Sequence, residues 1–333
     1  MRIRTTLATA AGVAALALVA APPATIASGQ APTSGNAAHS AAQQAGERVD
    51  LGHDAAPAAA VKYGEPDAGE HPYVGLMIAY TWADANGDGV QTDDELRAGW
   101  RCSGTQIDED TFLTAGHCTY GADAVAIWFA EDLRDVQAAR EFVTFAGAID
   151  QESEHAADAW SYEAVSHPEY DDALFYLHDV GVVDDVTLAP GVTFETYGQL
   201  PDQGYWDTQL ATLKSDRDTY TTVGYGLQWS MPDSQGQGRL NQGEWIRLKA
   251  GGELIGYRQF AGGKANDAYV VLTSNAHTGG TCSGDSGGPT FVSGTSTVVA
   301  VTSFGMNTTC AGTSGLYRID TADDLAWLGQ FVD

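Results

Sequence analysis

Short runs of β-branched and aromatic residues, separated by Gly, Asp and Asn turns, constrain the fold of this chain more than any other feature. Examples are YVGLMIAYTW, AVAIWFA, VGVVDDV, YTTVGYG, AYVVLTS and STVVAVTSFG. Runs of this length and composition are typical of strands. The 39 glycines suit the many turns that such strands need. The pattern therefore predicts an all-β barrel or sandwich rather than βαβ units.

The end of the chain has a different pattern. Leu325, Leu328 and Phe331 recur at helical spacing after an Asp-rich segment that begins beyond Thr321. A Thr followed by acidic residues is typical of a helix N-terminus. We therefore expect a short C-terminal helix.

The first 60 residues differ in composition from the rest. Residues 1–27 have the pattern of a secretory signal peptide, with Arg2 and Arg4 before an Ala-rich apolar core. A transmembrane anchor is the alternative, but this core is shorter than the roughly 20 residues that a span needs. Residues 28–60 are rich in Ala, Gly, Ser and Gln, which predicts a flexible pro-segment or spacer. Residues 61–333 are expected to form one domain.

The chain is strongly acidic. It has 16 Lys and Arg against 44 Asp and Glu, which gives a formal charge of −28 at pH 7. Such a surface repels nucleic-acid phosphates and anionic lipids. We therefore expect no nucleic-acid partner and no stable membrane association. From the signal-peptide pattern we expect a secreted, extracellular protein, and we expect it to be a monomer.

One segment carries the pattern of an acyl-transfer nucleophile. In TCSGDSGGP (Thr281 to Pro289), Ser286 stands among glycines where the backbone must turn sharply. Small neighbours expose the hydroxyl group and let the N–H groups of Gly284 and Ser286 point towards a common position. An exposed nucleophile beside such donors is what acyl transfer requires.

Two other segments supply partners for that nucleophile. FLTAGHC (Phe112 to Cys118) follows an apolar run and places His117 beside a cysteine. HDVGVV places Asp179 at the head of a β-branched strand. Asp171, Asp172, Asp184 and Asp185 crowd the same region, but only Asp179 stands where such a strand begins.

In the order His, Asp, Ser, these motifs resemble the trypsin/chymotrypsin family of serine peptidases. HPEYDDALFYLHDVGVV, VAVTSFG and GLYRI also resemble family segments, so that the resemblance runs from about residue 61 to residue 333. Residues 185–280 carry few landmarks. The resemblance implies a chymotrypsin-like fold of two antiparallel Greek-key barrels. The Ala-rich, Lys-poor composition resembles that of actinobacterial exported proteins.

The resemblance also implies a role for each residue. Ser286 would be the nucleophile, His117 the general base and then acid, and Asp179 the residue that orients the imidazole ring. Gly284 and Ser286 would form the oxyanion hole. The substrates would be proteins or peptides, and catalysis would need no cofactor.

Four cysteines allow three pairings. The family resemblance implies Cys102–Cys118 beside the histidine and Cys282–Cys310 beside the nucleophile. Each bridge would stabilise the fold by roughly 3 kcal/mol. No Cys-x-x-Cys spacing is present that would favour a metal site instead.

The primary substrate pocket follows from the same resemblance. Its lining would be Gly280, Thr281, Ser303, Gly305 and Gly315, with Gly280 at the base. Trypsin-like members carry Asp at the base to bind Lys or Arg. With Gly there, we expect an open, uncharged pocket and cleavage after bulky apolar residues.

An activation pair is also implied. VKYG at Val61 resembles the new N-terminus that activated family members insert beside the Asp before the nucleophile, which is Asp285 here. We therefore expect cleavage after Ala60. The alternative is that residues 28–60 stay attached and Asp285 finds another partner.

An acidic segment, DANGDGVQTDDE, resembles an EF-hand calcium loop of twelve residues. Its candidate ligands are Asp84, Asn86, Asp88, the carbonyl of Val90, and Glu95, with Gly89 at the turn. Gln91 departs from the pattern, and the flanks look like strands rather than helices. The alternative is an acidic, solvated hairpin that binds no ion.

The leading hypothesis is therefore a secreted serine endopeptidase. Two other classes compete with it: a non-catalytic protease homologue that serves as a binding module, and a calcium-binding surface protein. The first usually lacks part of the triad, whereas His117, Asp179 and Ser286 are all present here. The second leaves GDSGGP unexplained.

Overall fold

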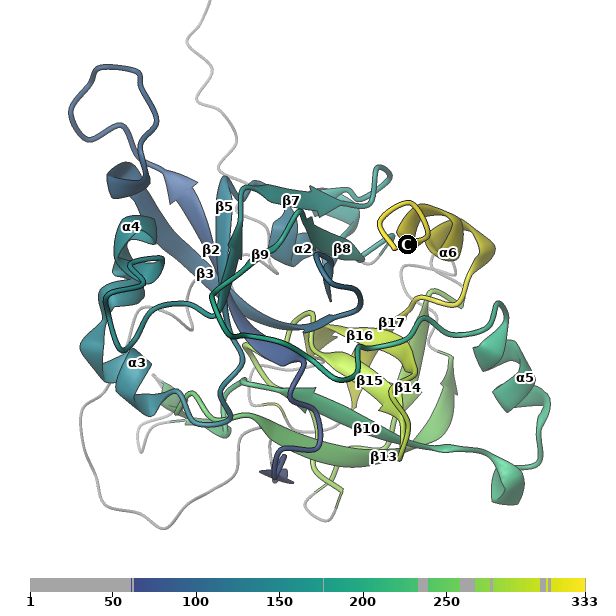
Figure 1. The fold of residues 1–333 in the computed structure, drawn as a ribbon. Coiled ribbons are helices and arrows are strands. Elements are labelled where there is room, and N and C mark those ends of the chain that lie inside the picture. Colours follow the sequence, from purple (N-terminus) through teal and green to yellow (C-terminus); the bar gives the residue numbers. More distant parts are fainter. Residues whose placement is uncertain are drawn as a thin grey trace, which may run out of the picture. The chain divides into compact units, whose positions relative to one another are not determined.

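The computed structural model describes residues 61, 63–175, 177–232, 239–257, 267–275, 278–305, 310 and 313–332. The predicted signal peptide (1–27) and pro-segment (28–60) lie outside these residues. The described chain consists mostly of antiparallel strands, with a few short helices (Figure 1). This confirms the prediction of an all-β fold.

The first half of the domain forms an antiparallel sheet of eight strands, in the order β7-β8-β4-β3-β2-β5-β6-β9. The long hairpin of β2 and β3 is its centre, and the acidic insertion joins these two strands. The strands are β2 (Val74–Trp82), β3 (Leu96–Gln106), β4 (Phe112–Thr114), β5 (Ala124–Trp128), β6 (Ala159–Ser161), β7 (Glu163–Ser166), β8 (Gly181–Asp184) and β9 (Thr187–Leu188).

The second half forms a closed barrel. Six strands follow one another in the order β13-β10-β15-β16-β17-β14, and β14 pairs back onto β13. β1 (Glu65–Pro66) adds to the outer edge of β13, and β11 (Trp229–Pro232) pairs with β12 (Arg239–Gln242). The barrel strands are β10 (Thr219–Gly224), β13 (Leu248–Tyr257), β14 (Tyr269–Leu272), β15 (Pro289–Val292), β16 (Val298–Gly305) and β17 (Ser314–Arg318).

The helices lie outside the sheets. They are α2 (Gly116–Thr119), α3 (Arg134–Ala139), α4 (Phe145–Ala148), α5 (Tyr205–Ala211) and α6 (Ala322–Leu328). The side chain of Thr321 caps α6 by accepting a hydrogen bond from the Asp324 N–H at 3.1 Å. The predicted C-terminal helix is therefore confirmed, although Phe331 lies beyond its end. No helix in the described part of the chain is long and apolar enough to cross a membrane.

One apolar cluster spans both halves. Leu76 and Val182 from the first sheet belong to the same cluster as Val223, Phe291 and Val301 from the barrel. All five side chains are almost completely buried. Burying this area stabilises both halves together, so residues that either half contributes to a site are held by one core.

A buried ion pair also joins the halves. Arg247 Nε donates to Asp67 Oδ2 at 2.9 Å, and both side chains are almost fully buried. Arg247 Nη1 donates to the carbonyl oxygens of Val74 in β2 (3.1 Å) and of Phe129, just after β5 (2.7 Å). His71 Nδ1 lies 2.5 Å from the other Asp67 oxygen. The charge of Arg247 is thus compensated inside the protein.

Candidate active site

His117 and Asp179 form a buried, hydrogen-bonded pair. His117 lies on α2, just after β4, and Asp179 lies two residues before β8. His117 Nδ1 is 3.1 Å from Asp179 Oδ1 and 3.0 Å from Oδ2, and the His117 backbone N–H donates to Oδ1 at 2.9 Å. Because Asp179 faces Nδ1, the proton of the neutral ring is held there, and Nε2 remains as a proton acceptor.

The charges around His117 favour its protonated form. Burial of the ring lowers the pKa of His117, but the charge of Asp179 and its hydrogen bond raise it more. Asp172, at the start of the 3-10 turn Asp172–Leu174, raises this pKa further. The net result is a pKa above the ordinary value for histidine, which suits a base that takes and returns a proton near neutral pH.

A third side chain contacts Asp179. The Ser303 hydroxyl group on β16 donates a hydrogen bond to Asp179 Oδ2. Sequence analysis placed Ser303 in the wall of the substrate pocket, whereas its hydroxyl group faces the carboxylate. Asp179 is fully buried, so each donor offsets part of the cost of removing its charge from water. The two residues are 124 positions apart, and no local motif indicates their contact.

The loop that carries Ser286 precedes β15. Gly284 and Gly287 have φ angles of +95° and +77°, a region that glycine adopts at little cost. The N–H groups of Gly284 and Ser286 donate no hydrogen bond to any described residue. Both are therefore available to a developing oxyanion.

Ser103 on β3 holds this loop against the first sheet. Its backbone N–H donates to the Ser286 carbonyl at 2.8 Å, and its hydroxyl group donates to the Gly284 carbonyl at 2.9 Å. A Cβ atom on Gly287 would lie 2.8 Å from the backbone nitrogen of Ala115, two residues before His117. The loop of Ser286 and the helix of His117 are thus in direct contact. Among the described residues, Ser286 Oγ has no hydrogen bond to His117.

Asp285 is buried beneath the same loop. Its carboxylate accepts hydrogen bonds from the N–H groups of Gly226 and Cys282, both at 2.8 Å. Burial raises the pKa of Asp285 to about 6, while these two bonds and the positive charge of Arg101 lower it. Arg101 therefore lies close enough to influence the loop, although the sequence motifs did not indicate it.

The predicted activation residue Val61 is fully buried. It packs with Leu248 and Ala250 on β13. Leu248 pairs with Gly224 on β10, two residues before Gly226, whose N–H binds Asp285. Val61 therefore lies on the strand pair that leads to Asp285, and its side chain occupies an apolar site there.

Two of the predicted pocket glycines each lie directly against a neighbouring side chain. A Cβ atom on Gly315 would lie 2.5 Å from Phe304 Cε1, so the Phe304 ring covers this glycine. A Cβ atom on Gly280 would lie 2.8 Å from Ser274 Cβ. A register shift between Thr302 and Phe304 puts Phe304 directly opposite Gly315. The Ser274 and Phe304 side chains therefore leave no room for a side chain at these two glycines.

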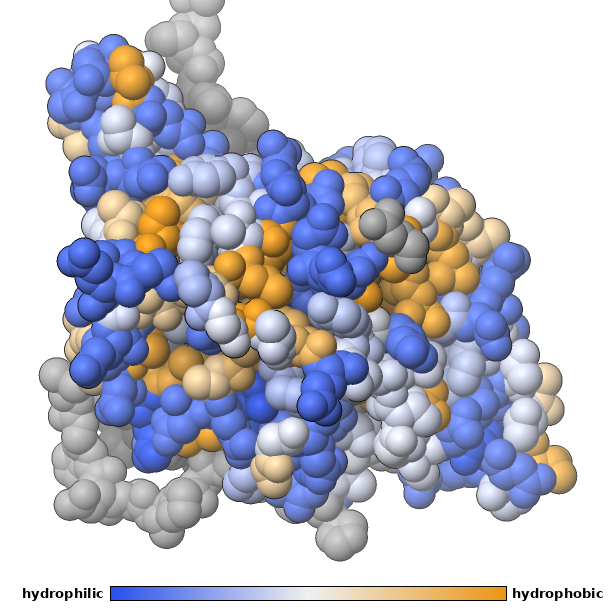
Figure 2. All heavy atoms as spheres, in the orientation of Figure 1, coloured by the Kyte–Doolittle hydropathy of each residue, from blue (hydrophilic) through white to orange (hydrophobic). Residues whose placement is uncertain are grey.

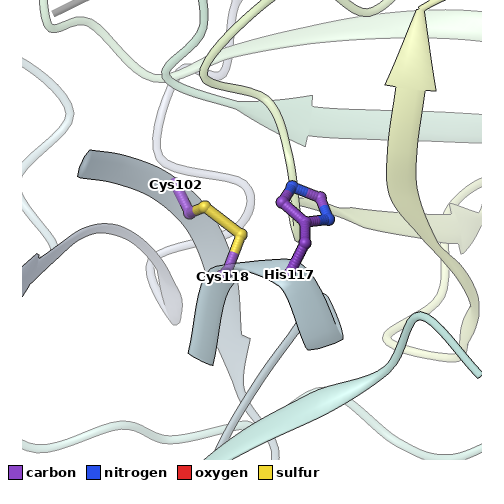
Figure 3. Close-up of side chains that lie close together, drawn as sticks. All are labelled: Cys102, His117 and Cys118. Carbon is purple, nitrogen blue, oxygen red and sulfur yellow. A yellow bond between two sulfur atoms is a disulfide. The ribbon is translucent and has the colours of Figure 1, made fainter. Parts of the chain in front are cut away.

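Both cysteine pairs implied by the family resemblance are bonded, as Cys102–Cys118 and Cys282–Cys310. Figure 3 shows the first bridge beside His117. It ties α2 to β3, the strand that also carries Ser103. Cys282 and Cys310 pack with Leu227, and Cys282 lies in the loop of Ser286.

The acidic insertion between β2 and β3 projects from the sheet (Figure 1), and its surface is mostly hydrophilic (Figure 2). Carboxylate oxygens of Asp84, Asp88 and Glu95 lie within 4.8 Å of one another. Asp84 Oδ1 accepts a hydrogen bond from Gly87 N–H at 2.7 Å, and Asn86 Oδ1 accepts one from Asp88 N–H at 2.8 Å.

Glu95 is the buried member of this group. The residue is 6% exposed, and its Oε1 has no hydrogen-bond partner, whereas Oε2 accepts a hydrogen bond from Trp82 Nε1 at 3.3 Å. A buried carboxylate oxygen without a partner is costly. Hard oxygen donors in this arrangement are suited to calcium.

Comparison with known proteins adds independent findings. The family model described as Trypsin matches residues 83–327. HL collagenase, a solved structure, shares 19% sequence identity and a TM-score of 0.54, over 81% of this chain and 97% of the collagenase. Two structures of heparin-binding protein, one a variant of the human protein, have TM-scores of 0.50 and identities of 16% and 18%. Each of these matches covers 80% of this chain and 94% of theirs. No curated protein matches the sequence.

Proposed function

Because the chain belongs to the trypsin family, with a chymotrypsin-like fold, we propose that it is a secreted serine endopeptidase with Ser286, His117 and Asp179 as its catalytic triad. The observation that carries the proposal is the buried His117–Asp179 pair, packed against a loop in which the N–H groups of Gly284 and Ser286 have no acceptor among the described residues. A binding module would have no need for this combination.

The reaction follows from these positions. Ser286 Oγ attacks the substrate carbonyl carbon while His117 Nε2 takes the hydroxyl proton, and the N–H groups of Gly284 and Ser286 bind the oxyanion. The C–N bond then breaks, and His117 gives its proton to the leaving amine. A water molecule, deprotonated by His117, attacks the acyl ester and releases the acid and free Ser286. Asp179, held by Ser303, stabilises the charged imidazole in both halves.

Labelling with a fluorophosphonate tests this proposal, because the reagent reacts only with an activated serine. We expect labelling of the wild type and none of Ser286→Ala or His117→Ala. Ser293→Ala is the control, since this serine lies on the barrel away from the triad. A folded wild type that never labels would contradict the peptidase proposal and favour the binding module.

For specificity, we propose cleavage after bulky apolar residues. Gly280 and Thr281 place no charge at the base of the pocket, so a Lys or Arg side chain would find no partner there. A peptide library identifies the residue before each cleaved bond, and cleavage mainly after Lys or Arg would overturn this preference.

For activation, we propose that cleavage after Ala60 frees the amino group of Val61, which then pairs with Asp285. Val61 is already buried on the strand pair that leads to this carboxylate. A cation at Asp285 would offset its burial. N-terminal sequencing of the active enzyme should read Val-Lys-Tyr-Gly, and full activity with residues 28–60 attached would refute the pairing.

We also propose that the acidic insertion binds calcium, through the side chains of Asp84, Asn86, Asp88 and Glu95 and the carbonyl of Val90. The unpartnered Glu95 Oε1 supports this, because an ion there would compensate it. Calcium should raise the melting temperature relative to chelator, and Glu95→Gln should abolish the difference. Asp94→Asn, a neighbour outside the ligand set, should keep it. Equal melting with calcium and with chelator would contradict the site.

The remaining proposals follow from charge and sequence. We propose that the protein acts outside the cell as a monomer on proteins or peptides, without nucleic-acid partners or stable membrane association. Analytical ultracentrifugation and fractionation of the producing culture test these points. A dimer, or protein retained with the membranes, would contradict them.

A further inference from the structure

Arg101 places a guanidinium group beside the loop of Ser286, and this group has no hydrogen-bond acceptor among the described residues. Within the described part of the chain, no acceptor binds this half-buried side chain and no carboxylate lies within ion-pair distance of it. Arg247 and Arg318 are almost fully buried, and both have ion pairs and further hydrogen bonds. Arg101 differs from both, because a half-buried cation without a hydrogen-bond acceptor keeps part of its desolvation cost uncompensated.

Contacts with glycines fix the position of the group. A Cβ atom on Gly284 would lie 3.0 Å from Arg101 Nη2 and 3.1 Å from Nε, so the guanidinium group lies directly against this oxyanion-hole residue. Its central carbon is 5.8 Å from the centre of the Trp245 ring. A Cβ atom on Gly243 would be 3.6 Å from Nη2. The group is thus held in a niche beside the reacting atoms.

The niche lies next to the disulfide bridge that flanks His117. Arg101 directly precedes Cys102, whose bridge to Cys118 lies beside His117 (Figure 3). In the proposed reaction, His117 gives its proton to the leaving amine, so we infer that the chain after the cleaved bond lies on the side of this bridge. The pocket residues Gly305 and Gly315 lie on the other strands, β16 and β17, and would hold the residue before the bond.

Arg101 is charged at neutral pH. Burial lowers the pKa of Arg101 to about 10, and the nearby charge of Asp285 partly opposes this. Both carboxylate oxygens of Asp285 accept hydrogen bonds from backbone N–H groups. The N–H donors of the planar Arg101 guanidinium group are therefore available to a carboxylate other than that of Asp285. The group can bind such a carboxylate through two parallel hydrogen bonds.

We propose that Arg101 binds a carboxylate group of the substrate on the leaving-group side of the cleaved bond. This proposal rests on the proposed peptidase function. The carboxylate could come from an Asp or Glu side chain one or two residues after the bond, or from the C-terminus of a short leaving peptide. The chemistry is the same for both sources, and the substrates below separate them.

The first test compares peptides that are identical up to the cleaved bond. The side-chain peptide carries Glu at the second position after the bond and has an amidated C-terminus. The neutral peptide carries Gln at that position, also with an amidated C-terminus. The C-terminal peptide carries Gln at that position and ends there with a free carboxylate. We expect kcat/KM to be about tenfold or more higher for at least one of the two carboxylate peptides than for the neutral one, as a charge-assisted hydrogen bond predicts. The preferred peptide identifies the source.

In Arg101→Met, kcat/KM should be the same for the carboxylate peptides and the neutral peptide. In Arg101→Lys, part of the preference for a carboxylate peptide should remain. Arg97→Met, an exposed arginine on the same strand, is the matched control and should keep the full preference. If Arg101 acts only by lowering the pKa of Asp285, Arg101→Met will lower kcat/KM equally for all three peptides and leave the preference for a carboxylate unchanged. That result would overturn the proposal, as would a wild type that prefers neither carboxylate.

A binding measurement separates this proposal from the peptidase function. Fluorescence anisotropy with Ser286→Ala protein reports the affinity for each labelled peptide without hydrolysis. If the wild type does not hydrolyse peptides, Ser286→Ala should still bind a carboxylate peptide about tenfold more tightly than the neutral one, and adding Arg101→Met should abolish the difference. Equal affinities in this assay would overturn the Arg101 proposal by themselves.

Discussion

The Phe304 ring packs directly on the Cα atom of Gly315, so that a Cβ atom there would lie 2.5 Å from Phe304 Cε1. Neither the ring nor the glycine backbone can give way freely, because both belong to paired strands of the barrel. A side chain at position 315 must therefore displace the ring or strain the strand pair.

We expect Gly315→Ala to destabilise the protein by about 1–3 kcal/mol, the usual effect of overpacking. Gly251→Ala is the control, because this exposed strand glycine has no atom within 4 Å of the Cβ position. Its effect should stay within about 0.5 kcal/mol. Urea unfolding in the Ser286→Ala background measures both. A Gly315→Ala protein as stable as its parent would show that the ring moves without cost.

The pH dependence of hydrolysis should reflect the charges around His117. Hydrolysis needs the neutral ring, so kcat/KM should rise with pH through an apparent pKa above 6.5. Asp172→Asn removes one charge that raises this pKa and should move the rise to lower pH. Asp171→Asn is the control, because an Asn side chain can still accept the hydrogen bond from Ala173 N–H. Identical pH profiles for Asp172→Asn and wild type would contradict the assignment.

Asp285 should make stability fall as the pH rises. Its pKa is about 6 in the folded, uncleaved chain and near 3.8 when unfolded. Between these values the folded state holds a proton that the unfolded state has lost, so unfolding becomes easier as the pH rises through this window. The difference corresponds to about 3 kcal/mol. In Asp285→Asn, the free energy of unfolding should not fall with pH in this window.

Urea titrations at several pH values, with Ser286→Ala as the parent, measure the Asp285 effect. Freeing the Val61 amino group should also reduce the slope, because a nearby cation lowers the pKa of the carboxyl group. If Ser286→Ala and Ser286→Ala/Asp285→Asn show the same pH dependence, the buried carboxyl group does not titrate in this range.

The buried pair of Asp67 and Arg247 should be costly to break from one side. Asp67→Asn leaves the guanidinium charge without its counter-ion, and we expect a loss of about 3–5 kcal/mol. The double variant Asp67→Asn/Arg247→Met removes the buried charge as well and should be more stable than Asp67→Asn alone. Thermal melts of the three proteins measure this. A double variant less stable than the single one would show that the hydrogen bonds of Arg247 outweigh its charge.

Local sequence patterns were enough for much of this molecule. GDSGGP and AGHC place Ser286, Gly284 and His117 because the loop needs small residues and positive φ angles within a few positions. The alternation of short apolar runs with turns predicted the strands, and the Thr321 cap predicted the start of α6. Each of these features depends on neighbours in the chain, and pattern analysis detects such features well.

Contacts between distant segments were not predictable in the same way. The hydroxyl group of Ser303 turns to Asp179, and Asp172 raises the pKa of His117, because the fold brings three separate segments together. The register shift before Phe304, which places its ring against Gly315, depends on how β16 and β17 pair. Arg101 belongs to this class too: its sequence position beside Cys102 gave no sign of a charge next to Gly284.

The two hydrogen bonds by which Ser103 holds the loop of Ser286 have a consequence for synthesis of the chain. The ribosome delivers Ser103, His117 and Asp179 long before Gly284 and Ser286, and the nucleophile reaches its bonded position only when the last strands can fold onto the first sheet. A growing chain therefore carries the His117–Asp179 pair without its nucleophile while residues 180–285 are added. In the proposed peptidase, hydrolysis could not begin before the polypeptide is complete, which protects the nascent chain even before the proposed cleavage after Ala60.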